Sequence, residues 1–138
     1  MKNLSLILLA AWLAGGCANV EKNAYLTVGT TSVAVEAARA AYIDYANTGR
    51  VPAKQFAEVK ALYEKYQAAM EKAQAMLAAY QANPEPGADN LMAALQPASA
   101  AASALIELVR SYLPSPERER LNAKIKDPPA TGPPAKLP

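Results

Sequence analysis

The chain lacks histidine and has only one cysteine among its 138 residues. Histidine is a frequent metal ligand and the side chain best suited to exchange protons near neutral pH, so its absence argues against most metal centres and nucleophile–base pairs. A single cysteine cannot form a disulfide within the chain, so the fold depends on packing. A carboxylate such as Asp44 could still act in catalysis, but we expect Asp44 on a solvated face. The sequence therefore predicts no enzyme, metal or cofactor.

Charge of one sign and aromatic residues other than tyrosine are also scarce. There is one tryptophan, one phenylalanine and seven tyrosines, so tyrosine supplies most of the aromatic bulk. Lys and Arg together number 14 against 12 Asp and Glu, which gives a net charge of +2. Nucleic-acid binding draws its affinity from clustered Lys and Arg. The near-neutral balance therefore argues against nucleic acid as a partner.

A short apolar run lies at the N-terminus, from Leu4 to Leu13 with only Ser5 interrupting it. A membrane-spanning helix needs roughly 20 apolar residues, so this run is too short to be one. It follows Lys2 and precedes the small residues at positions 14–16, which stand directly before Cys17. A positive start, an apolar centre and small residues at a cleavage point define a secretory signal peptide.

The order Leu13-Ala14-Gly15-Gly16-Cys17 resembles the lipobox of bacterial lipoproteins. The resemblance implies cleavage before Cys17, which then carries a diacylglyceryl thioether and an amide-linked acyl chain. Ala14 occupies the place where lipoboxes usually have leucine. The alternative is an ordinary secretory leader cut after Ala18, which would discard the cysteine with the leader. Lipid chains on Cys17 would hold the protein at a membrane, because each buried CH₂ contributes about 0.8 kcal/mol.

The residues after the cysteine bear on localisation. Ala18 and Asn19 follow Cys17, and no aspartate stands next to it. In enterobacterial lipoproteins that pattern resembles the outer-membrane sorting signal. The resemblance therefore implies a cell-envelope protein anchored at the periplasmic face of the outer membrane.

Helical periodicity starts after this N-terminal region, over residues 21–46. The first predicted helix begins near Glu21 or, because Gly29 and β-branched neighbours lower helix propensity, only at Ser32. Asn47-Thr48-Gly49 is a typical C-terminal stop. The apolar seam has steps of three and four residues: Val28, Thr31, Val35, Ala38, Tyr42 and Tyr45.

The second predicted helix covers residues 52–81 and has the strongest pattern. Pro52 suits the first turn of a helix, where its missing N–H has no cost. An a/d heptad stripe held over more than three heptads is typical of coiled-coil packing. Phe56 stands at the start of this stripe and is expected in the core. The stripe consists of Phe56, Val59, Tyr63, Tyr66, Met70, Ala73, Leu77 and Tyr80.

A third helix is predicted after the break Asn83-Pro84-Glu85-Pro86-Gly87. Pro97 lies inside it and predicts a kink rather than two separate helices, because the seam keeps its phase across the proline. The seam alternates four and three residues: Leu91, Leu95, Ala98, Ala102, Leu105, Val109 and Tyr112.

Together these patterns predict an all-α chain, an antiparallel three-helix bundle with coiled-coil-like seams. Pro114 and Pro116 open a possible short helix up to Lys126. Five of the twelve residues from Asp127 to Pro138 are proline, so this tail is expected to be disordered or polyproline-II-like. The predicted organisation is a signal peptide over 1–16, a lipidated N-terminus and linker over 17–20, the bundle over 21–113 and the short helix with its tail over 114–138.

No residues besides Cys17 form a recognisable site, and an interaction surface is the remaining candidate. Tyrosines on the seams are expected to pack in the core or at its edge in preference to forming a ligand platform. Basic residues after Pro114 alternate with Glu117 and Glu119, which is typical of a solvated helix but would also suit anionic lipid or cell-wall polymer. The candidate surface residues are Tyr42, Tyr45, Tyr63, Tyr66, Arg118, Arg120, Lys124 and Lys126.

The leading functional prediction is a non-catalytic envelope lipoprotein, a helical spacer or interaction module tethered through Cys17. Its partners would be the membrane and an envelope protein or peptidoglycan, and the oligomeric state stays open. The lipidated cysteine and the proline-rich segment are also similar to phage outer-membrane spanin subunits, which implies a lysis accessory as one alternative. Murein lipoproteins share the cysteine and the heptads, but Lys136 is not the last residue here, so wall attachment is not expected. A soluble exported ligand carrier is the other alternative.

Overall fold

The computed structural model describes residues 20–83 and 87–127. Within these two ranges the chain forms four α-helices and no strand, so the predicted all-α fold is confirmed. The signal peptide, Cys17 and the proline-rich residues 128–138 lie outside the described residues. The helices are α2 (Val20–Ala46), α3 (Ala53–Ala82), α4 (Ala88–Tyr112) and α5 (Ser115–Lys126).

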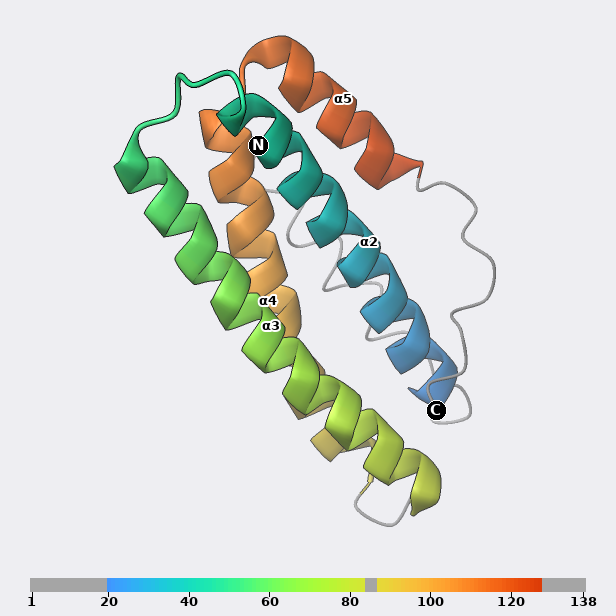
Figure 1. Cartoon of the computed structure of the whole chain (residues 1–138). Coiled ribbons are helices and arrows are strands. Elements are labelled where there is room, and N and C mark those ends of the chain that lie inside the picture. The colour runs from blue at the N-terminus through green and yellow to red at the C-terminus, as the bar shows by residue number, and fades with distance from the viewer. Residues whose placement is uncertain (1–19, 84–86, 128–138) are drawn as a thin grey trace.

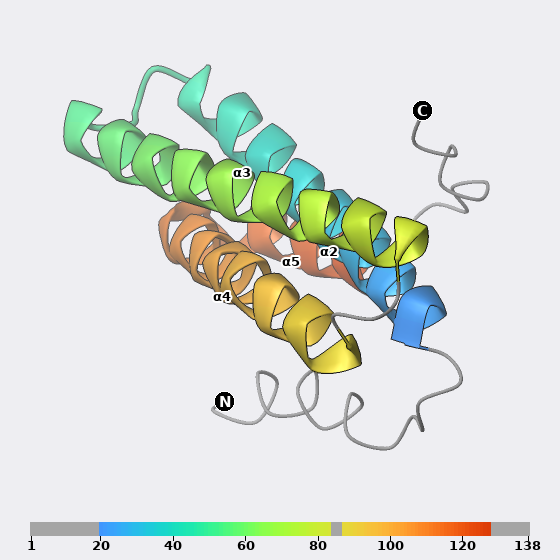
Figure 2. The same ribbon diagram turned by 90° about the horizontal axis from the view of Figure 1, so that it is seen from below.

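Successive helices run in opposite directions (Figure 1, Figure 2). The bundle therefore has two distinct ends. At the first, named here the Val20 end, α2 and α4 begin and α3 ends. At the second, the Gly49 end, α2 and α4 end and α3 and α5 begin. One continuous apolar core connects the two ends, and none of its buried residues is polar apart from tyrosine hydroxyls.

α2 begins at Val20, which agrees with the earlier of the two predicted starts. Thr27 and Thr30 lie in the weak stretch, and their hydroxyls donate to the carbonyls of Asn23 and Leu26 at 2.9 and 2.7 Å. These bonds satisfy the hydroxyls within the helix itself. Gly49 follows the helix with a positive φ of 73°, a conformation that glycine adopts without a Cβ penalty.

α3 follows the predicted heptad stripe, with one exception. Its buried residues are spaced as the stripe requires, but Phe56 is 52 % exposed and does not belong to the core. α4 ends at Tyr112, whose hydroxyl bonds to Glu58 on α3. The first turn of α3 therefore extends past the last turn of α4, and Phe56 has no partner helix on that side. The buried residues of α3 are Val59, Tyr66, Met70, Ala73 and Leu77.

α4 is the central helix of the bundle, packed against both α2 and α3. It runs through Pro97 as one helix, as the unbroken phase of its seam predicts. Pro97 is exposed, and so is Ala93, whose carbonyl has lost its usual donor and can bond to water instead. Small residues on its inner face allow close approach of the neighbouring helices. The buried residues are Leu91, Leu95, Ala98, Ala101, Ala102, Leu105 and Val109.

α5 packs beside α2 at the Gly49 end (Figure 1). The sequence places this segment outside the bundle, yet Leu121 is fully buried and Ile125 packs against the core. Leu113, just before the helix, is also buried. A fourth, short helix therefore shares the core with α2, α3 and α4. Because α5 has 12 residues and α2 has 27, it covers only part of α2.

Candidate functional site

The candidate tyrosines separate into two groups at different levels of the bundle. The first group, Tyr63 and Tyr66 on α3, faces α2, and their ring centroids are 6.3 Å apart. The Tyr63 hydroxyl donates to the Glu36 carboxylate at 2.9 Å, and the Arg39 guanidinium lies 5.2 Å from the Tyr63 ring centroid. The Tyr66 hydroxyl donates to Ser32 Oγ at 3.3 Å. These contacts join α2 to α3, which is a packing role.

The second group lies at the Gly49 end and surrounds Glu58. The Tyr112 hydroxyl donates to the Glu58 carboxylate, while Tyr45 is half-buried. Tyr42 is 2 % exposed, and its hydroxyl finds no hydrogen-bond partner among the described residues. Burial raises the pKa of Tyr42, and the nearby Tyr45 and Glu58 raise it further. The pKa of Tyr112 is also raised, chiefly by its hydrogen bond to Glu58.

Raised pKa values keep these hydroxyls protonated at neutral pH. Burial raises the pKa of Tyr63, as does its hydrogen bond to Glu36, and burial raises the pKa of Tyr66 despite an opposing effect of Ser32. A tyrosine acts as a base or nucleophile only as the phenolate. The two tyrosine groups are therefore suited to donating hydrogen bonds within the core.

The four candidate cations all lie on α5, which packs beside α2. Arg118 donates from its guanidinium to the Leu113 carbonyl at 3.0 Å, which helps to fix the turn between α4 and α5. Arg120, Lys124 and Lys126 are exposed. The two lysines occupy the last turn of α5, where a positive charge interacts favourably with the helix dipole. Within the described residues, no hydrogen bond or ring contact joins these four cations to the candidate tyrosines.

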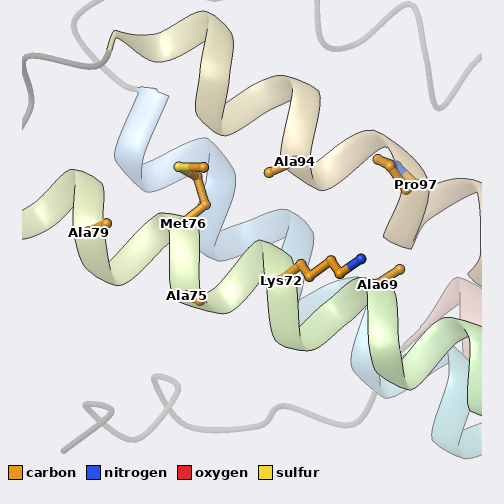
Figure 3. Close-up of a pocket in the computed structure, with 7 residues that line it drawn as sticks. All are labelled: Ala69, Lys72, Ala75, Met76, Ala79, Ala94 and Pro97. Carbon is orange, nitrogen blue, oxygen red and sulfur yellow. The ribbon is translucent and has the colours of Figure 1, made fainter.

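An apolar groove between α3 and α4 was missed by sequence reasoning. It has a volume of about 520 Å³ and is open to solvent (Figure 3). The Lys72 stem lies along it, and Met76 projects toward α4. The groove exists because small side chains of α3 and α4 face one another near Pro97, and the alanine-rich sequence around Pro97 was the available signal. Its lining is Ala69, Lys72, Ala75, Met76, Ala79, Ala94 and Pro97.

A second, smaller groove lies where α2, α4 and α5 meet. Its volume is about 210 Å³, and Ile125 of α5 borders it beside Thr30 and Thr31 of α2. Glu107 and Arg110 also line it and form an ion pair at 2.6 Å. This groove marks the place where α5 stops covering α2.

Within residues 20–83 and 87–127, no cluster of three His, Cys, Asp or Glu side chains could hold a metal ion. One described helix, α4, is long and apolar enough to cross a membrane by length and composition alone. Leu91, Leu95 and Leu105 of this helix are buried in the core, and Leu108 is partly buried.

No family model, curated protein or solved structure matches the chain. Function is therefore inferred from the residues and the geometry. Cys17 lies outside the described residues, but its distance along the chain from the bundle is fixed. Val20, the first residue of α2, stands three positions after it.

Proposed function

We propose that this protein is a small bacterial envelope lipoprotein, anchored through lipid chains on Cys17, whose helical bundle acts as a non-catalytic spacer or interaction module. The observation that carries the proposal is the placement of the single cysteine. It ends a leader with a positive start, a ten-residue apolar run and three small residues. Such a leader is typical of a secretory signal peptide. The cysteine at its end is the lipid attachment point that the lipobox resemblance implies.

The bundle is consistent with a tethered role. Its core needs no disulfide and no metal, because apolar side chains from four helices fill it. A body of this kind folds independently of its anchor and keeps a fixed shape at a membrane surface. On this proposal the protein sits at the periplasmic face of the outer membrane, where an envelope protein or peptidoglycan would be its partner.

The proposed antiparallel coiled-coil-like packing also gives the spacer a defined length. α3 has 30 residues, so at about 1.5 Å per residue it is roughly 45 Å long. An anchor at the Val20 end would place the Gly49 end at about this distance from the membrane. The exposed Phe56 lies there and would be available to a partner.

Intact-mass spectrometry of the membrane fraction tests the anchor. The mature wild-type chain is expected to begin at Cys17 and to carry a diacyl or triacyl mass. Cys17→Ser should abolish that mass and release the protein from the membrane. Ala18→Ser is the matched control, because it changes the neighbouring residue and keeps the cysteine. An unmodified wild-type chain beginning at Asn19 would instead indicate a soluble exported bundle.

The α3–α4 groove favours one second candidate, an exported carrier of an apolar ligand. Its lining is apolar except for Lys72, and it is open to solvent. Ala79→Trp would fill the groove, whereas Ala78→Trp would place the same side chain at an exposed neighbouring position outside it. Loss of binding of a fluorescent fatty acid with Ala79→Trp alone would support this function. Equal binding by both variants would argue against it.

A further inference from the structure

Leu26 is the most exposed of the large apolar side chains in the described residues, at 56 %. It lies on the second turn of α2, near the Val20 end. α5 does not reach it, because Ile125 near the end of α5 borders Thr30 and Thr31, and Leu26 lies a full turn beyond Thr30. Leu26 therefore remains exposed on the part of α2 that α5 does not cover.

We propose that the first two turns of α2 contact the bilayer surface, with the bundle tilted so that Leu26 is directed toward the acyl chains. This inference rests on the proposed anchoring at Cys17 and adds the face of the bundle that meets the lipid. On this proposal, Leu26 contacts the same membrane into which the lipid chains of Cys17 insert.

The length of the tether supports this orientation. Three residue steps separate Cys17 from Val20, and a fully extended chain covers at most about 3.6 Å per residue, or roughly 11 Å in total. Leu26 lies six residues further along α2, about 9 Å at the helical rise. A lipidated Cys17 therefore keeps the start of α2 close to the headgroups, and a modest tilt brings Leu26 onto them.

The charges at the Val20 end agree with the same face. Lys22 and Leu26 are four residues apart, so they share one side of α2. The Glu21 carboxylate accepts a hydrogen bond from Gln81 Nε2 at 2.9 Å, and Tyr25 also contacts Gln81. These contacts hold the acidic group against α3. The outer side keeps Lys22, whose stem can lie along apolar chains while its ammonium meets phosphate.

The other exposed large apolar residues provide an internal comparison. Ile43 and Phe56, at 39 % and 52 % exposure, belong to the Gly49 end. An anchor at Cys17 holds that end away from the bilayer. Membrane contact is therefore expected at Leu26 and at neither of the other two residues.

Single-tryptophan fluorescence tests the inference. The only tryptophan, Trp12, lies in the leader that cleavage removes, so the mature chain has no background tryptophan emission. Leu26→Trp and the control Phe56→Trp would be purified as lipidated full-length proteins. Each would be reconstituted in vesicles of equal parts phosphatidylethanolamine and phosphatidylglycerol, with and without brominated acyl chains. Circular dichroism would establish that both variants keep the wild-type helix content.

The expected result is blue-shifted emission and strong quenching by brominated lipid for Leu26→Trp, with neither change for Phe56→Trp. Unquenched emission at position 26 in a protein that carries the lipid mass would overturn the inference and leave the proposed function standing. A blue shift without vesicles that disappears on deletion of residues 128–138 would show that the protein's own tail covers Leu26. A blue shift that depends on protein concentration would assign the face to a second copy. A chain without lipid would refute both the anchor and this inference.

Discussion

The two ends of the bundle are built from the same heptad pattern but differ in what completes them. At the Gly49 end, α5 adds a fourth helix and brings Leu121 into the core, next to a chain turn that buries Leu113. At the Val20 end, three helices meet without it, and an open apolar groove lies between α3 and α4. The core there includes the small Ala24 as well as Leu77 and Leu91.

This difference shows that a seam of the right period does not by itself determine how thick the core becomes. A heptad stripe provides one apolar side per helix. The amount of apolar side chain buried in the core depends on how many other helices pack against that side. The Gly49 end has the bulkier packing, whereas the Val20 end has the α3–α4 groove and the exposed Leu26. We therefore expect the Gly49 end to contribute more stability and the Val20 end to tolerate more change.

Leucine truncation in α4 should give the largest effect and tests the contrast directly. Leu105→Ala removes a fully buried side chain in the middle of the core and is expected to cost about 3–5 kcal/mol of unfolding free energy. Leu91→Ala lies in the first turn of α4 near the open groove, where the cavity can collapse, and should cost about 2–3 kcal/mol. Urea unfolding followed by circular dichroism measures both. A larger loss for Leu91→Ala would reverse the comparison of the two ends.

Leu121→Ala should give the next largest effect, because Leu121 is the only residue of α5 that is fully buried. We expect a loss of about 2–3 kcal/mol in the docking of α5, with faster amide hydrogen exchange in that helix. Exchange in α3 and α4 should stay near wild type. Asn122→Ala, at an exposed position on the same helix, is the matched control. Uniform loss of protection in all four helices would mean that α5 unfolds only together with the rest of the bundle.

High pH should weaken the Gly49 end through Tyr42. The pKa of Tyr42 is raised in the fold above its ordinary value of about 10, so its stabilising neutral form is fully present below pH 10. Stability should then fall as the pH rises from 10 through the folded pKa. In Tyr42→Phe this loss should be smaller. Thermal unfolding between pH 8 and 11 measures the difference, and an unchanged pH profile in the variant would exclude Tyr42 as its source.

At neutral pH the hydroxyl of Tyr42 should contribute little, because it has no partner among the described residues. Tyr42→Phe is therefore expected to change the unfolding free energy by less than about 0.5 kcal/mol. Tyr66→Phe, which loses the bond to Ser32, should cost about 1 kcal/mol and serves as the comparison. A larger cost for Tyr42→Phe would indicate a bound water at its hydroxyl.

Phe56→Ala should also have only a small effect on stability. The ring is more than half exposed, so truncation is expected to cost less than about 1 kcal/mol. The same urea titration measures it beside Leu105→Ala. A cost of 3 kcal/mol or more would indicate that Phe56 is buried in the core, as its place in the heptad stripe predicts.

Much of the fold could be predicted from local patterns. The helix boundaries followed from punctuation such as Pro52 and Gly49, and the continuity of α4 through Pro97 followed from the unbroken phase of its seam. The exposure of Phe56 could not be predicted, because it depends on where α4 ends relative to α3. The groove beside Pro97 likewise depends on the distance between two helices.

The candidate site divides in the same way. The prediction for Cys17 depends on the sequence of the leader and needs no tertiary structure. The candidate tyrosines were correctly expected at seams, and Tyr42 and Tyr66 are buried. The absence of contacts between them and the cations on α5 was not predictable, because the sequence does not show which helix α5 packs against.

The sequence by itself determined the all-α fold, most of the helix boundaries and most of the apolar side of each helix, since propensity, turn residues and periodicity act over a few residues. Only the tertiary structure decided that α5 joins the core, that Phe56 and Leu26 stay exposed and that a groove opens between α3 and α4. These features depend on the relative lengths and offsets of helices that are distant in sequence. Such offsets are set by the whole packing arrangement, because each side chain is buried only where another helix reaches it.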